Sequence, residues 1–104
     1  MRRPIVFLGT PNAGATVLRE LVKHHDVELV ITQPDKRRGR GGQLVASPVK
    51  AIALEHGIRV EHNMESLRTL TPHPDRIGVV VAYGRIIPTD ILQTCPMINI
   101  HFSL

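Results

Sequence analysis

The sequence predicts an α/β fold in which helices cover both faces of a parallel β-sheet. Apolar segments of strand length occur at residues 5–8, 27–32 and 77–82, and segments with helical periodicity separate them. Such apolar runs are typical of strands buried on both faces, as in parallel sheets. Strands that alternate with helices form right-handed βαβ units, whose helices pack on the faces of the sheet. The 104 residues fit one small domain with a buried core, although most doubly wound domains that bind a ligand are longer.

The remaining elements follow from helix caps and helix-breaking residues. The first helix is predicted at about residues 13–23, with Asn12 as its cap, because apolar side chains recur there at helical spacing. A second helix is expected to begin after Ser47, which precedes the proline favoured at a first helical position, and to end at Gly57. Shorter elements are predicted as well: strands at residues 58–61 and 98–101, and helical turns at residues 65–70 and from residue 89 or 90 to Pro96.

A long polar loop is predicted at residues 36–43, which contain three glycines and no apolar side chain. Because this segment can bury little, we expect it to be mobile. Its basic residues carry a charge equal to the net charge of +4 for the whole chain; they are Lys36, Arg37, Arg38 and Arg40. A cluster of this kind favours a polyanionic partner, although a solvated surface insertion fits the same pattern.

Composition and the N-terminal segment exclude several classes of protein. Hydrophobic residues make up 42% of the chain and aromatic residues 3%, which predicts a globular domain with an aliphatic core. The single cysteine, Cys95, excludes an internal disulfide framework, and the histidines lack the spacing of metal ligands. The apolar run after Arg2 and Arg3 is too short for a signal peptide, and no segment has the length of a membrane span. We therefore expect a cytoplasmic protein without a metal site.

The turn after the first strand does not fit a classical nucleotide site. The segment from Gly9 to Gly14 lacks the second glycine of the dinucleotide-binding fingerprint, and no lysine follows it as in a P-loop. Exposed amide groups at the start of the next helix could still bind an anion. We therefore do not expect NAD or ATP as a ligand.

The strongest candidate for chemistry is the last predicted strand. Asn99 and His101 alternate there with Ile98 and Ile100, so the two polar side chains share one face. Ligands bind outside the carboxyl ends of the strands in open parallel sheets, and these residues stand at such an end. An asparagine amide can donate to an oxyanion, and an imidazole can donate to it or exchange a proton, as acyl transfer requires. Neither residue is an obvious nucleophile, which favours direct transfer over a covalent intermediate, although an ordinary polar strand end fits the same spacing.

Several short motifs occur in order along nearly the whole chain. They are Gly9-Thr10-Pro11, Thr32-Gln33-Pro34-Asp35-Lys36 with Gly39-Arg40-Gly41, Ser47-Pro48-Val49-Lys50, Val79-Val80-Val81-Ala82-Tyr83-Gly84 with Ile87-Pro88, and Asn99-Ile100-His101 with Ser103-Leu104. Together they resemble the methionyl-tRNA formyltransferase family. The Asn-x-His and Ser-Leu elements are similar to those of formyltransferases in general, whereas the Gln-Pro-Asp loop and the Ser-Pro-Val-Lys helix start resemble the tRNA-directed branch.

The resemblance implies a reaction, a co-substrate and a set of site residues. The reaction would transfer a formyl group from 10-formyltetrahydrofolate to the amino group of methionyl-initiator tRNA, a step in translation initiation. Asn99 and His101 would be catalytic. The residues expected to contact the folate are Arg85, Ile86, Ile87, Ser103 and Leu104, and those expected to contact the tRNA are Lys36, Arg37, Arg38 and Arg40. No metal ion is implied.

The resemblance also implies that residues 1–104 are the N-terminal part of a catalytic domain. Its Rossmann-like sheet would be truncated after the strand that carries Asn99 and His101, and the family's third catalytic residue, an aspartate, would lie beyond Leu104. On this expectation, residues 1–104 would not include the family's C-terminal barrel domain. We therefore expect this fragment to be inactive, and the full-length protein to be a monomer that does not bind membranes.

The sequence departs from the family pattern at several positions. Phe102 replaces a small residue or proline, Ala13 replaces an aromatic residue, and Gly78 interrupts a β-branched strand. The segment at residues 66–75 is short and contains two prolines, so we expect the family's helix before residue 77 to be lost.

Two alternative functions fit the same residues. The first is a folate-dependent formyltransferase that acts on a small amine, such as glycinamide ribonucleotide or a nucleotide sugar. The second is a non-catalytic Rossmann-like module that binds RNA through the basic loop at residues 36–43.

Overall fold

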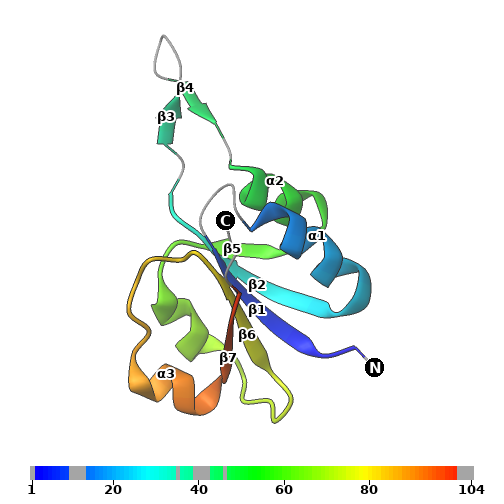
Figure 1. Cartoon of the computed structure of the whole chain (residues 1–104), viewed down its shortest axis with the longest axis vertical. Helices are drawn as coiled ribbons and strands as arrows, with labels where there is room; N and C mark the ends of the chain where they lie inside the picture. The colour runs from blue at the N-terminus through cyan, green and yellow to red at the C-terminus, as the bar shows by residue number, and fades with distance from the viewer. Residues whose placement is uncertain (1, 10–13, 35, 39–42, 46, 101–104) are drawn as a thin grey trace.

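A five-stranded parallel sheet forms the centre of the protein (Figure 1). The structure is a computed structural model that describes residues 2–9, 14–34, 36–38, 43–45 and 47–100. In spatial order the strands are β5 (Arg59–Glu61), β2 (Asp26–Ile31), β1 (Pro4–Gly9), β6 (Ile77–Val81) and β7 (Met97–Ile100). All neighbouring pairs in this sheet are parallel, which confirms the predicted fold class.

The order of the strands creates a topological switch point beside β1. From β1 the chain proceeds to β2 and then β5 at one edge, and it returns to β6 on the other side of β1. β1 and β6 pair from Ile5 and Ile77 to Gly9 and Val81, so the two strands end together. The connections after β1 and β6 therefore diverge from the same place, where open parallel sheets bind ligands.

Helices cover both faces of this sheet, as predicted. On one face, α1 (Ala15–His24) and α2 (Pro48–Glu55) share a hydrophobic cluster with the strands. On the other face, the 3-10 helix η1 (Met64–Thr69) and α3 (Thr89–Thr94) contribute to a second cluster (Figure 1). The expectation of only short helical structure at residues 65–70 is confirmed by η1. No helix in the described part of the chain is long and apolar enough to cross a membrane.

The Phe7 ring packs against Gly9 at the end of β1 and against Gly14 just before α1. A Cβ atom added at Gly9 would lie 2.8 Å from Phe7 Cε1, and one added at Gly14 would lie 2.5 Å from Phe7 Cζ. Phe7 is fully buried, so both glycines provide space that its ring fills. The predicted start of the helix near residue 13, with Asn12 as cap, was wrong. The helix begins at Ala15 with Gly14 as its N-cap and no capping side chain, because Gly14 must pack against the ring; Asn12 itself lies outside the described residues.

The segment predicted as a loop at residues 36–43 contains regular structure. β3 (Lys36–Arg38) pairs antiparallel with β4 (Gln43–Val45), and the pair projects away from the central sheet (Figure 1). The prediction of a loop without secondary structure was therefore wrong for these residues. An antiparallel pair is held by hydrogen bonds between backbone groups, which need no particular side chains, so the polar and glycine-rich sequence did not reveal it. Arg40 lies outside the described residues.

Gly78 has a packing role that the sequence did not reveal. A Cβ atom added there would lie 1.9 Å from Met97 Sδ, so the Met97 side chain fills the space above this position. Gly78 and Met97 are direct neighbours in the pairing of β6 with β7. The glycine that interrupts the β-branched strand thus allows β7 to pack closely against β6.

A nearly buried ion pair links the strands on either side of β1. Arg76, which is 8% exposed and precedes β6, donates from Nε to the Glu28 carboxylate on β2. Its Nη1 donates to the carbonyl oxygen of Thr71 at 2.7 Å. A buried guanidinium needs partners of this kind, because the loss of hydration is otherwise uncompensated. The pair therefore connects β2, β6 and the segment that follows η1.

Replacing Arg76 by methionine is expected to lower the free energy of unfolding by about 2 kcal/mol. The reason is that the Glu28 carboxylate, which is 32% exposed, would keep its charge without its partner. The double variant with Glu28→Gln and Arg76→Met should lose less stability than Arg76→Met alone. Urea unfolding followed by circular dichroism measures both values, and a larger loss in the double variant would contradict this account.

Candidate functional site

A cavity of about 540 Å³ lies between the carboxyl end of β6, the loop that follows it, α3 and β7. Its lining brings together all four described residues that the sequence analysis assigned to catalysis and folate contact. The lining residues are Val80, Ala82, Tyr83, Gly84, Arg85, Ile86, Ile87, Leu92, Met97 and Asn99. The cavity thus joins two segments of the chain that the sequence analysis could relate only through the family resemblance.

Asn99 presents its amide to this cavity from β7. It pairs in register with Val80 of β6, and its side chain is exposed on the same side of the strand as Met97. Ile100 points to the opposite face, where it packs against the cluster beneath α1 and α2. This alternation agrees with the predicted face of Asn99. His101, Ser103 and Leu104, the other residues predicted at this strand end, lie outside the described residues.

The loop at residues 82–88 has an unusual backbone conformation. Ala82 has a φ angle of 50° and Gly84 one of 76°. The left-handed region is unfavourable for alanine, so the surrounding structure must maintain this conformation at Ala82. Such strained positions cluster at sites of function, and Ala82 lies directly after β6 in the wall of the cavity.

Between these two residues, Tyr83 attaches the loop to the hydrophobic cluster beneath η1 and α3. Its side chain is 2% exposed, and burial raises the pKa of its hydroxyl, with a smaller opposing effect from Arg85. By contrast, Ile86 is 92% exposed, and Arg85 is also exposed. The loop therefore offers one apolar and one cationic side chain beside the Asn99 amide. This combination suits a flat, partly apolar ligand that carries acceptor groups.

The basic residues predicted to contact a polyanion leave the sheet at the same end. Lys36, Arg37 and Arg38 form β3, which follows the carboxyl end of β2, whereas the loop at residues 82–88 follows the carboxyl end of β6. β2 and β6 both run parallel to β1, so both connections start from one rim of the sheet (Figure 1). A ligand in the cavity and a polyanion on the hairpin can thus approach from one side.

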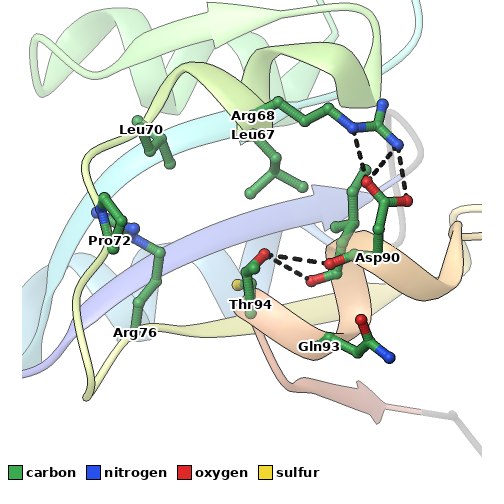
Figure 2. A pocket seen from close by; sticks show the side chains of 10 residues that line it. Leu67, Arg68, Leu70, Pro72, Arg76, Asp90, Gln93 and Thr94 are labelled. Carbon is green, nitrogen blue, oxygen red and sulfur yellow. Dashed lines mark hydrogen bonds and ion pairs between the residues drawn. The ribbon is translucent and has the colours of Figure 1, made fainter.

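A second cavity, of about 330 Å³, lies between η1 and α3 and contains none of the predicted site residues (Figure 2). Arg68 of η1 reaches across its edge to Asp90 of α3, with its Nε and Nη2 donating at 2.9 and 2.8 Å. Cys95 lines the interior and is 3% exposed, as expected for a packed small side chain, and burial raises the pKa of its thiol. Sequence reasoning missed Arg68 and Asp90, because residues 22 positions apart show no local pattern.

Among the described residues, no group of histidine, cysteine and acidic side chains is arranged to hold a metal ion. The polar groups that the first cavity offers are instead an amide, a guanidinium and a phenol. These groups can donate hydrogen bonds and stabilise negative charge.

Comparison with known proteins relates the chain to one family. The chain matches the family described as "Formyl transferase" over residues 2–104. It is 44% identical over 109 residues to a protein of Chromobacterium violaceum named "Methionyl-tRNA formyltransferase", which covers 96% of this chain and 36% of that protein. A protein of Trichodesmium erythraeum with the same name is 42% identical over 110 residues, or 96% of this chain and 33% of that protein. The chain spans about a third of the length of the curated relatives it matches.

Two glycines allow the loop conformation to be tested with a matched control. Gly84 and Gly57 have φ angles of 76° and 68°, and an added Cβ would meet nothing within 4 Å at either position. Replacement of either one by alanine should therefore lower the free energy of unfolding by about 1 kcal/mol through backbone conformation alone.

Only Gly84→Ala is expected to change the fluorescence of Tyr83, because Gly84 is its neighbour in the cavity wall and Gly57 follows α2. Tyr83 is the only tyrosine, and the chain has no tryptophan, so the signal reports on this loop. If Gly84→Ala and Gly57→Ala gave the same Tyr83 fluorescence spectrum, the result would contradict the claim that the backbone at Gly84 maintains the loop at residues 82–88.

Proposed function

Because the chain belongs to the formyl transferase family, we propose that its cavity beside Asn99 binds 10-formyltetrahydrofolate. In this proposal the chain is part of an enzyme that transfers the formyl group to methionyl-initiator tRNA in translation initiation. The observation that carries the proposal is the presence of the Asn99 amide and the strained loop at residues 82–88 in one cavity. The relatives named methionyl-tRNA formyltransferase support the choice of acceptor.

The proposed reaction is a direct acyl transfer. The methionyl amino group attacks the formyl carbon and generates a tetrahedral intermediate whose oxygen carries negative charge. The Asn99 amide donates a hydrogen bond to this oxygen, and the His101 imidazole moves the proton from the amine to the folate nitrogen that leaves. The bond between carbon and folate nitrogen then breaks. The exposed amide of Asn99 makes no hydrogen bond within the described part of the chain, so it is available to a substrate.

The folate ring is proposed to bind against Arg85, Ile86 and Ile87. The exposed side chain of Ile86 provides apolar contact surface, and Arg85 provides charge for carboxylate or carbonyl groups. Ser103 and Leu104 are proposed to complete this contact. A cavity of about 540 Å³ lies within the range of small-molecule sites, and the proposed transfer uses no metal ion.

The tRNA is proposed to bind along the hairpin of β3 and β4. Lys36, Arg37, Arg38 and Arg40 would neutralise phosphates near the acceptor end of the tRNA. The backbone pairing of Lys36 with Val45 holds the base of β3 and β4, which defines the course of the strand that contains Lys36, Arg37 and Arg38.

We further propose that this chain supplies the formyl-donor site and part of the tRNA surface of a longer enzyme. The third catalytic residue, an aspartate, and the barrel domain would come from the remaining length that the relatives possess. The 104 residues alone are therefore proposed to be inactive in formyl transfer.

A chimeric enzyme tests the proposed reaction. Residues 1–104 would replace the matched segment of the Chromobacterium violaceum relative, which is 44% identical to this chain. The chimera is expected to transfer radiolabelled formyl from 10-formyltetrahydrofolate to methionyl-initiator tRNA. Glycinamide ribonucleotide and an amino nucleotide sugar serve as parallel acceptors. Transfer only to a small amine would support the first alternative, and salt-dependent tRNA binding by a folded chimera without transfer would support the RNA-binding module.

In the same chimera, His101→Ala is expected to reduce kcat by roughly 10²- to 10⁴-fold, because the proton would lose its carrier. The affinity for tRNA should change little, since His101 is not among the proposed phosphate contacts. His24→Ala is the matched control, because this histidine is exposed at the end of α1, away from the cavity. Near-normal turnover of the His101 variant would disprove the role proposed for it.

A further inference from the structure

We propose that Arg68, through its ion pair with Asp90, is a positioning residue for the formyl-donor loop at residues 82–88. The proposal rests on the proposed function, because it assigns to Arg68 the task of holding the loop that contacts folate. Arg68 does not line the donor cavity and would act only through Asp90 and α3.

The geometry of the pair fixes the end of the loop. Arg68 donates from Nε to Asp90 Oδ2 at 2.9 Å and from Nη2 to Asp90 Oδ1 at 2.8 Å, an arrangement in which two parallel bonds define an orientation (Figure 2). Arg68 also donates to Glu65 of η1, which holds the guanidinium in place. Asp90 lies in the first turn of α3, two residues after the N-cap at Pro88, where the loop ends. The ion pair, together with the packing of Ile87 and Ile91 in the hydrophobic cluster, therefore positions the end of the loop at the start of the helix.

The other end of the loop is held by packing. Tyr83 is buried in the cluster beneath η1 and α3, and the strained Ala82 precedes it. Between the two ends, Gly84, Arg85 and Ile86 are exposed and can contribute little packing. The position of these exposed residues therefore depends on how the two ends of the loop are held. η1 contributes at both ends, through the cluster that contains Tyr83 and through the pair of Arg68 with Asp90.

Because α3 is short, its position depends on contacts such as the ion pair of Arg68 with Asp90. The helix has six residues and no side-chain cap, and helices of this length depend on tertiary contacts. The Arg68 and Asp90 side chains are 37% and 60% exposed, so their pair should contribute little to overall stability. Its loss is expected to release the loop without unfolding the domain.

The first test uses the chain itself and requires no enzymatic activity. In Arg68→Gln, acrylamide is expected to quench the fluorescence of Tyr83 about twofold more strongly, because the loop moves away from the cluster more often. Arg2→Gln is the matched control, since Arg2 forms a similar exposed pair with Asp26 at 2.9 Å at the amino end of the sheet. Asp90→Asn, which removes the charge of the same pair from the other side, should raise the quenching to a similar extent. Equal quenching in Arg68→Gln and Arg2→Gln would overturn the proposal.

The second test uses the chimeric enzyme described above. Arg68→Gln should raise the KM for 10-formyltetrahydrofolate about two- to fivefold while kcat changes less than about twofold, because donor binding and not the chemical step is affected. Asp90→Asn should raise this KM to a similar extent, and Arg2→Gln should leave it unchanged. A uniform loss of melting temperature with unchanged KM would show a purely structural role and overturn the proposal. An inactive chimera would instead contradict the proposed function, whereas the quenching result would still decide whether Arg68 holds the loop.

Discussion

The parallel pairing of β1 with β6 is the constraint on which the rest of the structure depends. β1 is buried between β2 and β6, and the chain leaves it toward one edge of the sheet before it returns on the other side. The two neighbouring strands end together while their connections diverge, which is the condition for a ligand site in an open α/β sheet. The cavity beside Asn99 lies next to this point, and the basic hairpin leaves the same rim.

The hydrophobic cluster beneath η1 and α3 connects stability with the candidate site. It contains Tyr83, which attaches the strained loop, and it lies beside the ion pair of Arg76 with Glu28. The loop at residues 82–88 is thus held at one end by the buried Tyr83 side chain, whereas Ile86 in its middle is almost fully exposed. Ligand sites are commonly formed by a few exposed residues on a rigid scaffold. Little conformational entropy is then lost when the ligand binds.

Much of the fold and part of the candidate site could be predicted from local patterns. The apolar run at residues 77–82 indicated a buried strand, and Ser47 with its following proline indicated the start of α2, where Ser47 Oγ accepts from the Lys50 amide. The alternation around Asn99 correctly predicted which face its side chain occupies. The family, in turn, could be inferred from motifs spread along the chain, because these motifs occur in a fixed order.

The sequence by itself determined the α/β class, most element positions and the family, since strand burial, helix capping and proline breaks act over a few residues. Only the tertiary structure decided features that depend on contacts between distant residues. The start of α1 depends on the packing of Phe7 against Gly14, and the hairpin at residues 36–45 depends on backbone pairing. Likewise, the pair of Arg68 with Asp90 exists only because η1 and α3 lie side by side on one face of the sheet. Local patterns cannot encode such contacts, because they form only when the sheet brings the elements together.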